Sequence, residues 1–211
     1  MNDFILFGQP QIGDAEINEV VDSLKKGWLG TGPKTKRFEI DFAKYKSTDY
    51  SLALNSCTAG LHLSCLTLGL KPGDEVITTA MTFCATVNTI IHVGGKPVLV
   101  DIDPLTWNID PSKLEKKITS KTKAIIPVHF AGRSCDMDKI IEISNANNLK
   151  IIEDCAHAIE TIYKGRKAGT MGDMGVFSFY ATKNLAVGEG GMIISDNETL
   201  ISNLKILALH G

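Results

Sequence analysis

The sequence predicts an α/β protein with a mostly parallel central sheet sandwiched by helices. Short apolar runs rich in β-branched residues alternate with segments of helical character, and repeated units of this length form parallel sheets covered by helices. Turn signals separate the units, as in KPGDE (71–75) and VGGKP (93–97). The chain has 211 residues, 44% of them hydrophobic, which suffices for one large domain with a real core.

The expected elements follow one another along the chain. Two polar amphipathic segments, 14–26 and 34–46, are joined by GWLGTGP and form an N-terminal helical segment, residues 1–48, ahead of the large domain, residues 49–211. The expected strands are YSLAL (50–54), EVITT (75–79), PVLVDID (97–103), KAIIPVHF (123–130), KIIEDCAH (150–157) and the runs at 175–179 and 192–194. The expected helices are TAGLHLSCLTLGL (58–70), FCATVNTIIHVG (83–94), a segment from about Pro111, DMDKIIEISNANN (136–148) and a last stretch from Glu198 to His210.

Composition argues against several kinds of protein. With 22 basic and 24 acidic side chains and no basic cluster among aromatics, a nucleic-acid partner is not expected. The N-terminus carries Asp3 and no basic region, so it is a poor signal peptide. The uncharged run from Val76 to Gly95 is long enough to span a membrane, but its many polar residues favour a strand followed by a buried helix, so no membrane partner is expected.

The cysteines point to a reducing compartment. The five are widely spaced and form no CxxC pair, which argues against zinc and against a disulfide framework. We therefore expect a cytoplasmic protein without a metal site. These residues are Cys57, Cys65, Cys84, Cys135 and Cys155.

Candidate site residues follow the strands, because ligands of parallel α/β sheets bind beyond the carboxyl ends of the strands. Ser56, Cys57 and Thr58 open a helix whose free N–H groups suit a phosphate, although for this segment alone ordinary helix capping by Ser56 or Thr58 is the preferred interpretation. Phe83 follows the second strand and is either a platform for a flat ring or one more core aromatic. Asp154 follows an apolar strand, where a carboxylate needs a positive partner unless it caps a helix.

A lysine stands in an unusual place near the end of the chain. In SFYATKNLAVGEGG, Ser178 and Lys183 lie between an apolar run and a glycine-rich turn. A surface lysine in a loop is the ordinary interpretation. Taken with the other strand ends, however, the residues predict a site for pyridoxal phosphate (PLP), which needs a lysine for an imine, an acid for its ring nitrogen, an aromatic face and an anion cradle. Burial would depress the pKa of the lysine and make its amine nucleophilic.

Several stretches in order resemble the DegT/StrS family of sugar aminotransferases, which are PLP enzymes of the aspartate aminotransferase fold type. The similarity runs from GWLGTGP to the last residue. It is carried by NSCTAGLHL, KPGDEVITTAMTFCATVN, GGKPVLVDIDPLTWNID, KTKAIIPVHFAG, IIEDCAHAIETIYKGRKAGTMGDMGVFSFYATKNLAVGEGGMI and LALHG. The resemblance implies the large domain of that fold type.

The resemblance also implies roles for individual residues. Lys183 in SFYATKN is similar to the family's Schiff-base lysine, and Asp154 in EDCAHA to the acid paired with the pyridine nitrogen. His157 occupies the position near the phenolic oxygen of the cofactor. The remaining cofactor-binding positions are Phe83, which resembles the stacking aromatic, and Cys57, Thr58 and Ser178, which resemble the phosphate cup.

The activity implied by the resemblance is transfer of an amino group from an amino acid, usually glutamate, to a keto group of a nucleotide-linked deoxy sugar. The context of His157 resembles the branch that makes 4-amino sugars for bacterial cell-surface polysaccharide and lipopolysaccharide. Family members form homodimers with shared active sites and continue for roughly as many residues again, so we expect this chain to lack a C-terminal small domain.

Two other interpretations remain open at this stage. One is a truncated fragment that folds or dimerises without turnover. The other is a cysteine-nucleophile enzyme, in which Cys57 at a helix N-terminus is activated by His129 or His157.

Overall fold

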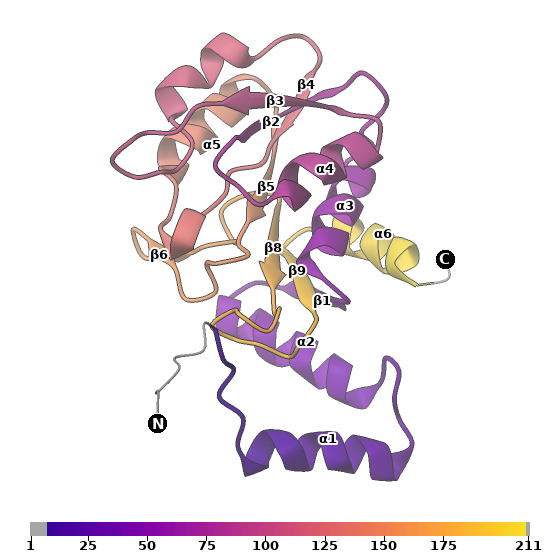
Figure 1. Ribbon diagram of the computed structural model, residues 1–211. Helices are drawn as coiled ribbons and strands as arrows, with labels where there is room; N and C mark the ends of the chain where they lie inside the picture. Colours follow the sequence, from indigo (N-terminus) through magenta and orange to yellow (C-terminus); the bar gives the residue numbers. More distant parts are fainter. Residues whose placement is uncertain (1–7, 210–211) are drawn as a thin grey trace.

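A seven-stranded sheet between two layers of helices organises the chain in a computed structural model, which describes residues 8–209 (Figure 1). The strands lie in the order β1-β9-β8-β5-β4-β2-β3, and β9 runs opposite to the other six. The predicted α/β class with a mostly parallel sheet is confirmed. The strands are β1 (Tyr50–Leu54), β2 (Glu75–Thr79), β3 (Lys96–Val100), β4 (Thr122–Ile125), β5 (Lys150–Asp154), β8 (Met174–Ser178) and β9 (Gly191–Ser195), and a separate hairpin pairs β6 (Ile162–Tyr163) with β7 (Arg166–Lys167).

Helices cover both faces of the sheet and bury its apolar strands. On one face Leu61, Ile90 and Leu204 pack in one cluster against the strands, one from each of the three helices α3, α4 and α6. On the other face Met137 of α5 and Phe42 of α2 anchor two further clusters. Since the strands are covered on both sides, their sequences are nearly continuous apolar runs. The helices are α1 (Asp14–Lys26), α2 (Pro33–Lys46), α3 (Cys57–Thr67), α4 (Cys84–His92), α5 (Met137–Ala146) and α6 (Glu198–Ala208).

One expected helix is wrong. The segment from Pro111 forms two short 3-10 turns, Pro111–Lys113 and Glu115–Lys117. Leu114 between them is fully buried, and Ile118 is already extended before β4 begins at Thr122. The chain must return to the sheet at once, which leaves no room for a regular helix. The other expected helices form, although His210 lies outside the described residues.

The N-terminal helices differ in how they attach. Phe42 of α2 packs against the aromatic rings of Phe177 and Phe179, so α2 belongs to the core. Helix α1 has no buried residue and lies beyond α2 (Figure 1), joined to it by ion pairs from Lys34 to Glu19 at 2.6 Å and to Asp22 at 2.9 Å. A domain division at residue 48 stays a prediction.

The uncharged run at 76–95 forms most of β2 and then α4, as expected. Within residues 8–209, no helix has the length and apolar character needed to cross a membrane.

Candidate active site

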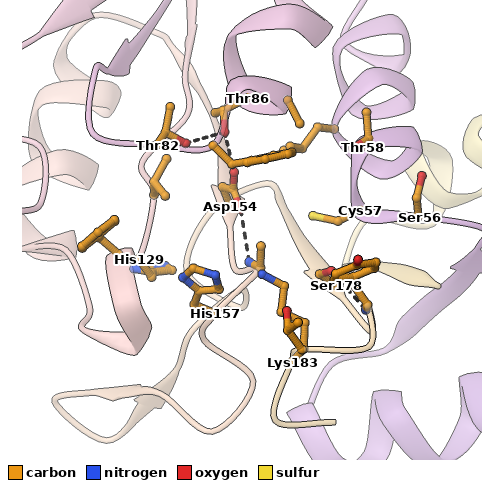
Figure 2. Close-up of a pocket in the computed structure, with 18 of the residues that line it drawn as sticks. Ser56, Cys57, Thr58, Thr82, Thr86, His129, Asp154, His157, Ser178 and Lys183 are labelled. Carbon is orange, nitrogen blue, oxygen red and sulfur yellow. Dashed lines mark hydrogen bonds between the residues drawn. The ribbon is translucent and has the colours of Figure 1, made fainter. Parts of the chain in front are cut away.

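A cavity of about 400 Å³ lies at the carboxyl ends of the parallel strands (Figure 2). Asp154 ends β5, Ser178 ends β8, and the first turns of α3 and α4 follow β1 and β2. All the sequence-predicted site residues line this one cavity. They are Cys57, Thr58, Phe83, Asp154, His157, Ser178 and Lys183.

Asp154 is a buried carboxylate at the wall of the cavity. Its carboxylate accepts a hydrogen bond of 2.8 Å from the Thr86 hydroxyl and one of 3.1 Å from the N–H of Ala156, and Thr86 is itself 2.6 Å from the Thr82 hydroxyl. Burial raises the pKa of Asp154, and these hydrogen bonds oppose the rise. A buried carboxylate of this kind is strongly stabilised by a cationic partner.

Lys183 reaches the cavity from the segment between β8 and β9. Its N–H closes a turn on the carbonyl of Tyr180 at 2.9 Å, and its side chain extends toward the space in front of Asp154 (Figure 2). Burial lowers the pKa of the Lys183 amine, while the nearby Cys57 and Asp154 act in the opposite sense. The amine is therefore uncharged, and nucleophilic, in a larger fraction of molecules than an exposed lysine would be.

His157 lies beside Lys183 at the same wall (Figure 2). Its pKa is lowered by burial and by the charge of Lys183. Asp154 acts in the opposite sense, and the lowered pKa favours the neutral imidazole, in which one ring nitrogen donates a hydrogen bond and the other accepts one.

The start of α3 lies at the cavity and presents backbone N–H groups that suit an anion. The Ser56 hydroxyl accepts the N–H of Ala59 at 3.1 Å, whereas the N–H groups of Cys57 and Thr58, in the first turn, have no carbonyl partner inside the helix. Gly191 allows this end to approach the sheet, because a Cβ there would lie 2.4 Å from the carbonyl carbon of Ser56. Capping and anion binding are thus compatible, and both are served by the same turn.

Phe83 is the aromatic at the start of α4, where it is the N-cap residue. Its side chain is not part of the core, because the residue is 76% exposed while lining the cavity. This exposure favours the interpretation as a platform for a flat ligand over that as a core aromatic.

A buried pair behind the cavity holds its wall in place. His129 Nδ1 accepts a hydrogen bond from the N–H of Cys135, so Nε2 carries the proton and donates a hydrogen bond of 2.9 Å to Glu153. The Glu153 carboxylate also accepts backbone N–H groups of residues 169, 171 and 172 at 2.6–2.7 Å. Burial acts to raise the pKa of Glu153, but these donors outweigh it and the pKa lies below its usual value.

The same contacts bear on two alternatives. His129, Glu153 and Cys155 offer ligand atoms within 4.8 Å of one another, but all of the Glu153 oxygens are already engaged by four donors. A cysteine nucleophile is also disfavoured, because burial and Asp154 raise the pKa of Cys57 well above its usual value. His129 has both ring nitrogens in use and cannot serve as its base.

Two important residues escaped the sequence analysis. Thr82 precedes Phe83, the N-cap residue of α4, and Thr86 lies in the first turn of the helix, so their four-residue spacing lets the two hydroxyls meet at the start of α4. Gly191 stands at the start of an apolar strand, and a glycine in such a position signals close backbone approach.

Comparison with known proteins agrees with this geometry. The profile of the DegT/DnrJ/EryC1/StrS aminotransferase family matches residues 10–211. The chain belongs to this family. Its α/β sheet is correspondingly that of the family's aminotransferases, in their N-terminal portion.

Individual relatives carry this further. The spore coat polysaccharide biosynthesis protein SpsC of Bacillus subtilis is 51% identical over 210 residues, which are 100% of this chain and 54% of SpsC. The putative sugar aminotransferase Spr1654 of Streptococcus pneumoniae, solved in PLP and PMP forms, is 42% identical with a TM-score of 0.93 over 98% of this chain and 58% of its own. DesI, solved in the presence of its TDP-sugar product, is 36% identical with a TM-score of 0.92 over 98% of this chain and 53% of its own. The chain thus spans about half the length of the relatives it matches.

Proposed function

We propose that this chain carries the cofactor-binding half of a PLP-dependent sugar aminotransferase. The enzyme would transfer an amino group from an amino acid to a keto group of a nucleotide-linked deoxy sugar, and we expect the amino acid to be glutamate. The observation that carries the proposal is the convergence of the Lys183 amine and the Asp154 carboxylate on one cavity, beside the N-terminus of a helix. A nucleophilic amine, a buried acid and an anion cradle are three of the four groups that PLP needs from its protein, and Phe83 is the candidate for the fourth, the aromatic face.

The residues present fit this cofactor. The cavity of about 400 Å³ has the size of a small-ligand site. Asp154 supplies the buried anion for a ring nitrogen, Phe83 the exposed aromatic face, and the first turn of α3 with Ser178 the donors for a phosphate. Burial makes the charged Asp154 carboxylate less favourable when it has no cationic partner. A protonated ring nitrogen beside it would offset this desolvation cost.

Each residue then has a defined task in the transfer. PLP, when bound, supplies the electron sink that stabilises negative charge at the carbon losing a proton. Lys183 would hold the cofactor and, as a free amine, would move the proton to and from the reacting carbon. Asp154 keeps the ring nitrogen protonated, with Thr86 orienting its carboxylate. His157 donates or accepts a hydrogen bond at the phenolic oxygen.

The relatives support the choice of substrate. SpsC is described by its role in spore coat polysaccharide biosynthesis, and DesI was solved with a TDP-sugar product. We therefore assign the product to cell-surface polysaccharide or lipopolysaccharide amino sugars, made in the cytoplasm, and expect the active protein to be a homodimer with shared sites. The five cysteines, all free, fit a reducing compartment.

The test is a covalent trap. The purified chain is mixed with PLP, reduced with borohydride and mapped by peptide mass spectrometry, and we expect one adduct, on Lys183. Lys183→Ala should abolish it, whereas Lys205→Ala, which removes an exposed lysine on α6, should leave it unchanged. A folded chain without an adduct, or an adduct that survives in Lys183→Ala, contradicts the proposal.

A second candidate is a folded chain that binds the cofactor without turnover. The observation behind it is that the chain spans about half of its relatives, so residues outside this half are available to complete their sites. Amino transfer from glutamate to a 4-keto TDP-sugar is measured separately, and an adduct on Lys183 without amino-sugar product would favour this candidate.

A further inference from the structure

A second cavity, of about 510 Å³, adjoins the first. The two share five lining residues, Ala156, His157, Ser178, Thr182 and Lys183. Lys183 therefore stands at the boundary between them. A molecule in the second cavity is within reach of the Lys183 amine and of whatever occupies the first.

The second cavity is lined by a polar pair that does not line the first. The Asn184 side-chain amide donates a hydrogen bond of 3.1 Å to Glu160 Oε2, and both residues line the cavity. Glu160 Oε1 has no hydrogen-bond partner among residues 8–209, so it is available as an acceptor. A carboxylate and an amide held side by side offer both acceptors and donors to a ligand.

The backbone on either side of Glu160 is fixed. On one side the buried Lys46 amine donates to the carbonyl of Ile159 at 3.1 Å. On the other side the Thr161 hydroxyl donates to the carbonyl of Gly132 at 2.5 Å. Glu160 is exposed to the cavity but mounted on a rigid segment, which reduces the ordering cost of binding.

The charges of the second cavity favour a neutral sugar ring over an anionic group such as a carboxylate. In the described part of the chain, Lys183 is the one lysine or arginine lining it, and Glu160 adds a negative charge. A dicarboxylate donor such as glutamate would meet repulsion from Glu160. A sugar ring presents neutral hydroxyl donors, for which a carboxylate is a strong acceptor.

We propose that Glu160, oriented by Asn184, binds hydroxyl groups of the nucleotide-linked sugar in this second cavity and is a specificity-determining residue. The proposal rests on the proposed function. It places the sugar in the second cavity, which shares Lys183 with the cavity proposed for the cofactor.

The test separates the sugar from its nucleotide. Isothermal titration calorimetry measures the Kd of the chain for TDP-glucose and for TDP. We expect TDP-glucose to bind the wild type more tightly, and Glu160→Ala to weaken TDP-glucose about tenfold with TDP unchanged, as expected for a lost hydrogen bond to a charged group. Glu142→Ala, which removes an exposed carboxylate on α5, should change neither Kd.

The remaining outcomes overturn the proposal. They are equal binding of TDP-glucose to the wild type and Glu160→Ala, equal binding of TDP-glucose and TDP to the wild type, and no binding of either at millimolar concentration. The PLP trap on the same samples keeps the two proposals apart. An adduct on Lys183 together with any of these outcomes rejects the role of Glu160 alone, whereas a missing adduct rejects the proposed function.

Discussion

Replacing Gly191 by alanine tests whether the close approach of α3 to the sheet builds the anion cradle. A Cβ at this position would lie 2.4, 2.5 and 2.6 Å from the carbonyl carbon and oxygen of Ser56 and the nitrogen of Cys57. Ordinary contact begins at 3.4 Å, so the first turn of α3 must move by about 1 Å, and backbone atoms cannot rotate away as a side chain can.

The expected cost of this overpacking is about 1–3 kcal/mol, which corresponds to a loss of roughly 2–12 °C in Tm for a chain of this length. Because the displaced N–H groups belong to the cradle, we also expect the Kd for PLP to rise about tenfold. Thermal unfolding and absorbance titration measure the two effects. Gly30→Ala is the matched control, since a Cβ there meets nothing within 4 Å. A Gly191→Ala chain that keeps the wild-type Tm and PLP affinity refutes the reasoning.

Two further substitutions address the acid and the buried amine. Thr86→Val removes the hydroxyl that donates a hydrogen bond to Asp154, so the pKa of Asp154 should rise further. We expect the affinity for PLP, measured by absorbance titration, to fall about tenfold. An unchanged affinity contradicts this prediction. Lys46→Met replaces an amine that lies 4.7 Å from the centre of the Phe177 ring and whose pKa burial lowers from 10.5. The unfolded chain binds more protons between the lowered pKa and 10.5, so this lysine makes the free energy of unfolding rise with pH through that window. Lys46→Met removes this pH dependence, so its free energy of unfolding relative to the wild type should be higher at pH 7 than near pH 10, and urea unfolding that shows a pH-independent difference counts against it.

The fold was largely predictable because its signals are local. Alternating apolar and helical runs, with glycine-rich turns between them, placed β1 to β5 and the helices α3 to α5 near their observed bounds. The prediction of a helix from Pro111 failed, although a proline followed by polar residues is compatible with a helix start. Leu114 is buried in the core between two short 3-10 turns, and this packing takes the place of a regular helix.

The site was predictable where a residue's position at a strand end, or a motif, announced it. Lys183 and Asp154 could be singled out in this way, and the structure brings them to one cavity. The pairing of Glu153 with His129 could not, because the two are 24 residues apart and meet across neighbouring strands. The bond between Glu160 and Asn184 likewise joins two loops whose proximity is set by the sheet.

The reversed direction of β9 gives the lysine segment a mechanical property. A parallel neighbour would have required a crossover helix between β8 and β9. Instead, residues 179–190 connect the carboxyl end of β8 to the start of the antiparallel β9 beside it, with Ser178 paired directly to Gly191. The pairing of β8 with β9 fixes both ends of the segment, so the length of the loop determines how far Lys183 extends toward Asp154. An insertion or deletion in residues 179–190 would therefore move the Lys183 amine relative to Asp154 while leaving the strands of the core in place. Evolution could change the position of the amine through loop length alone.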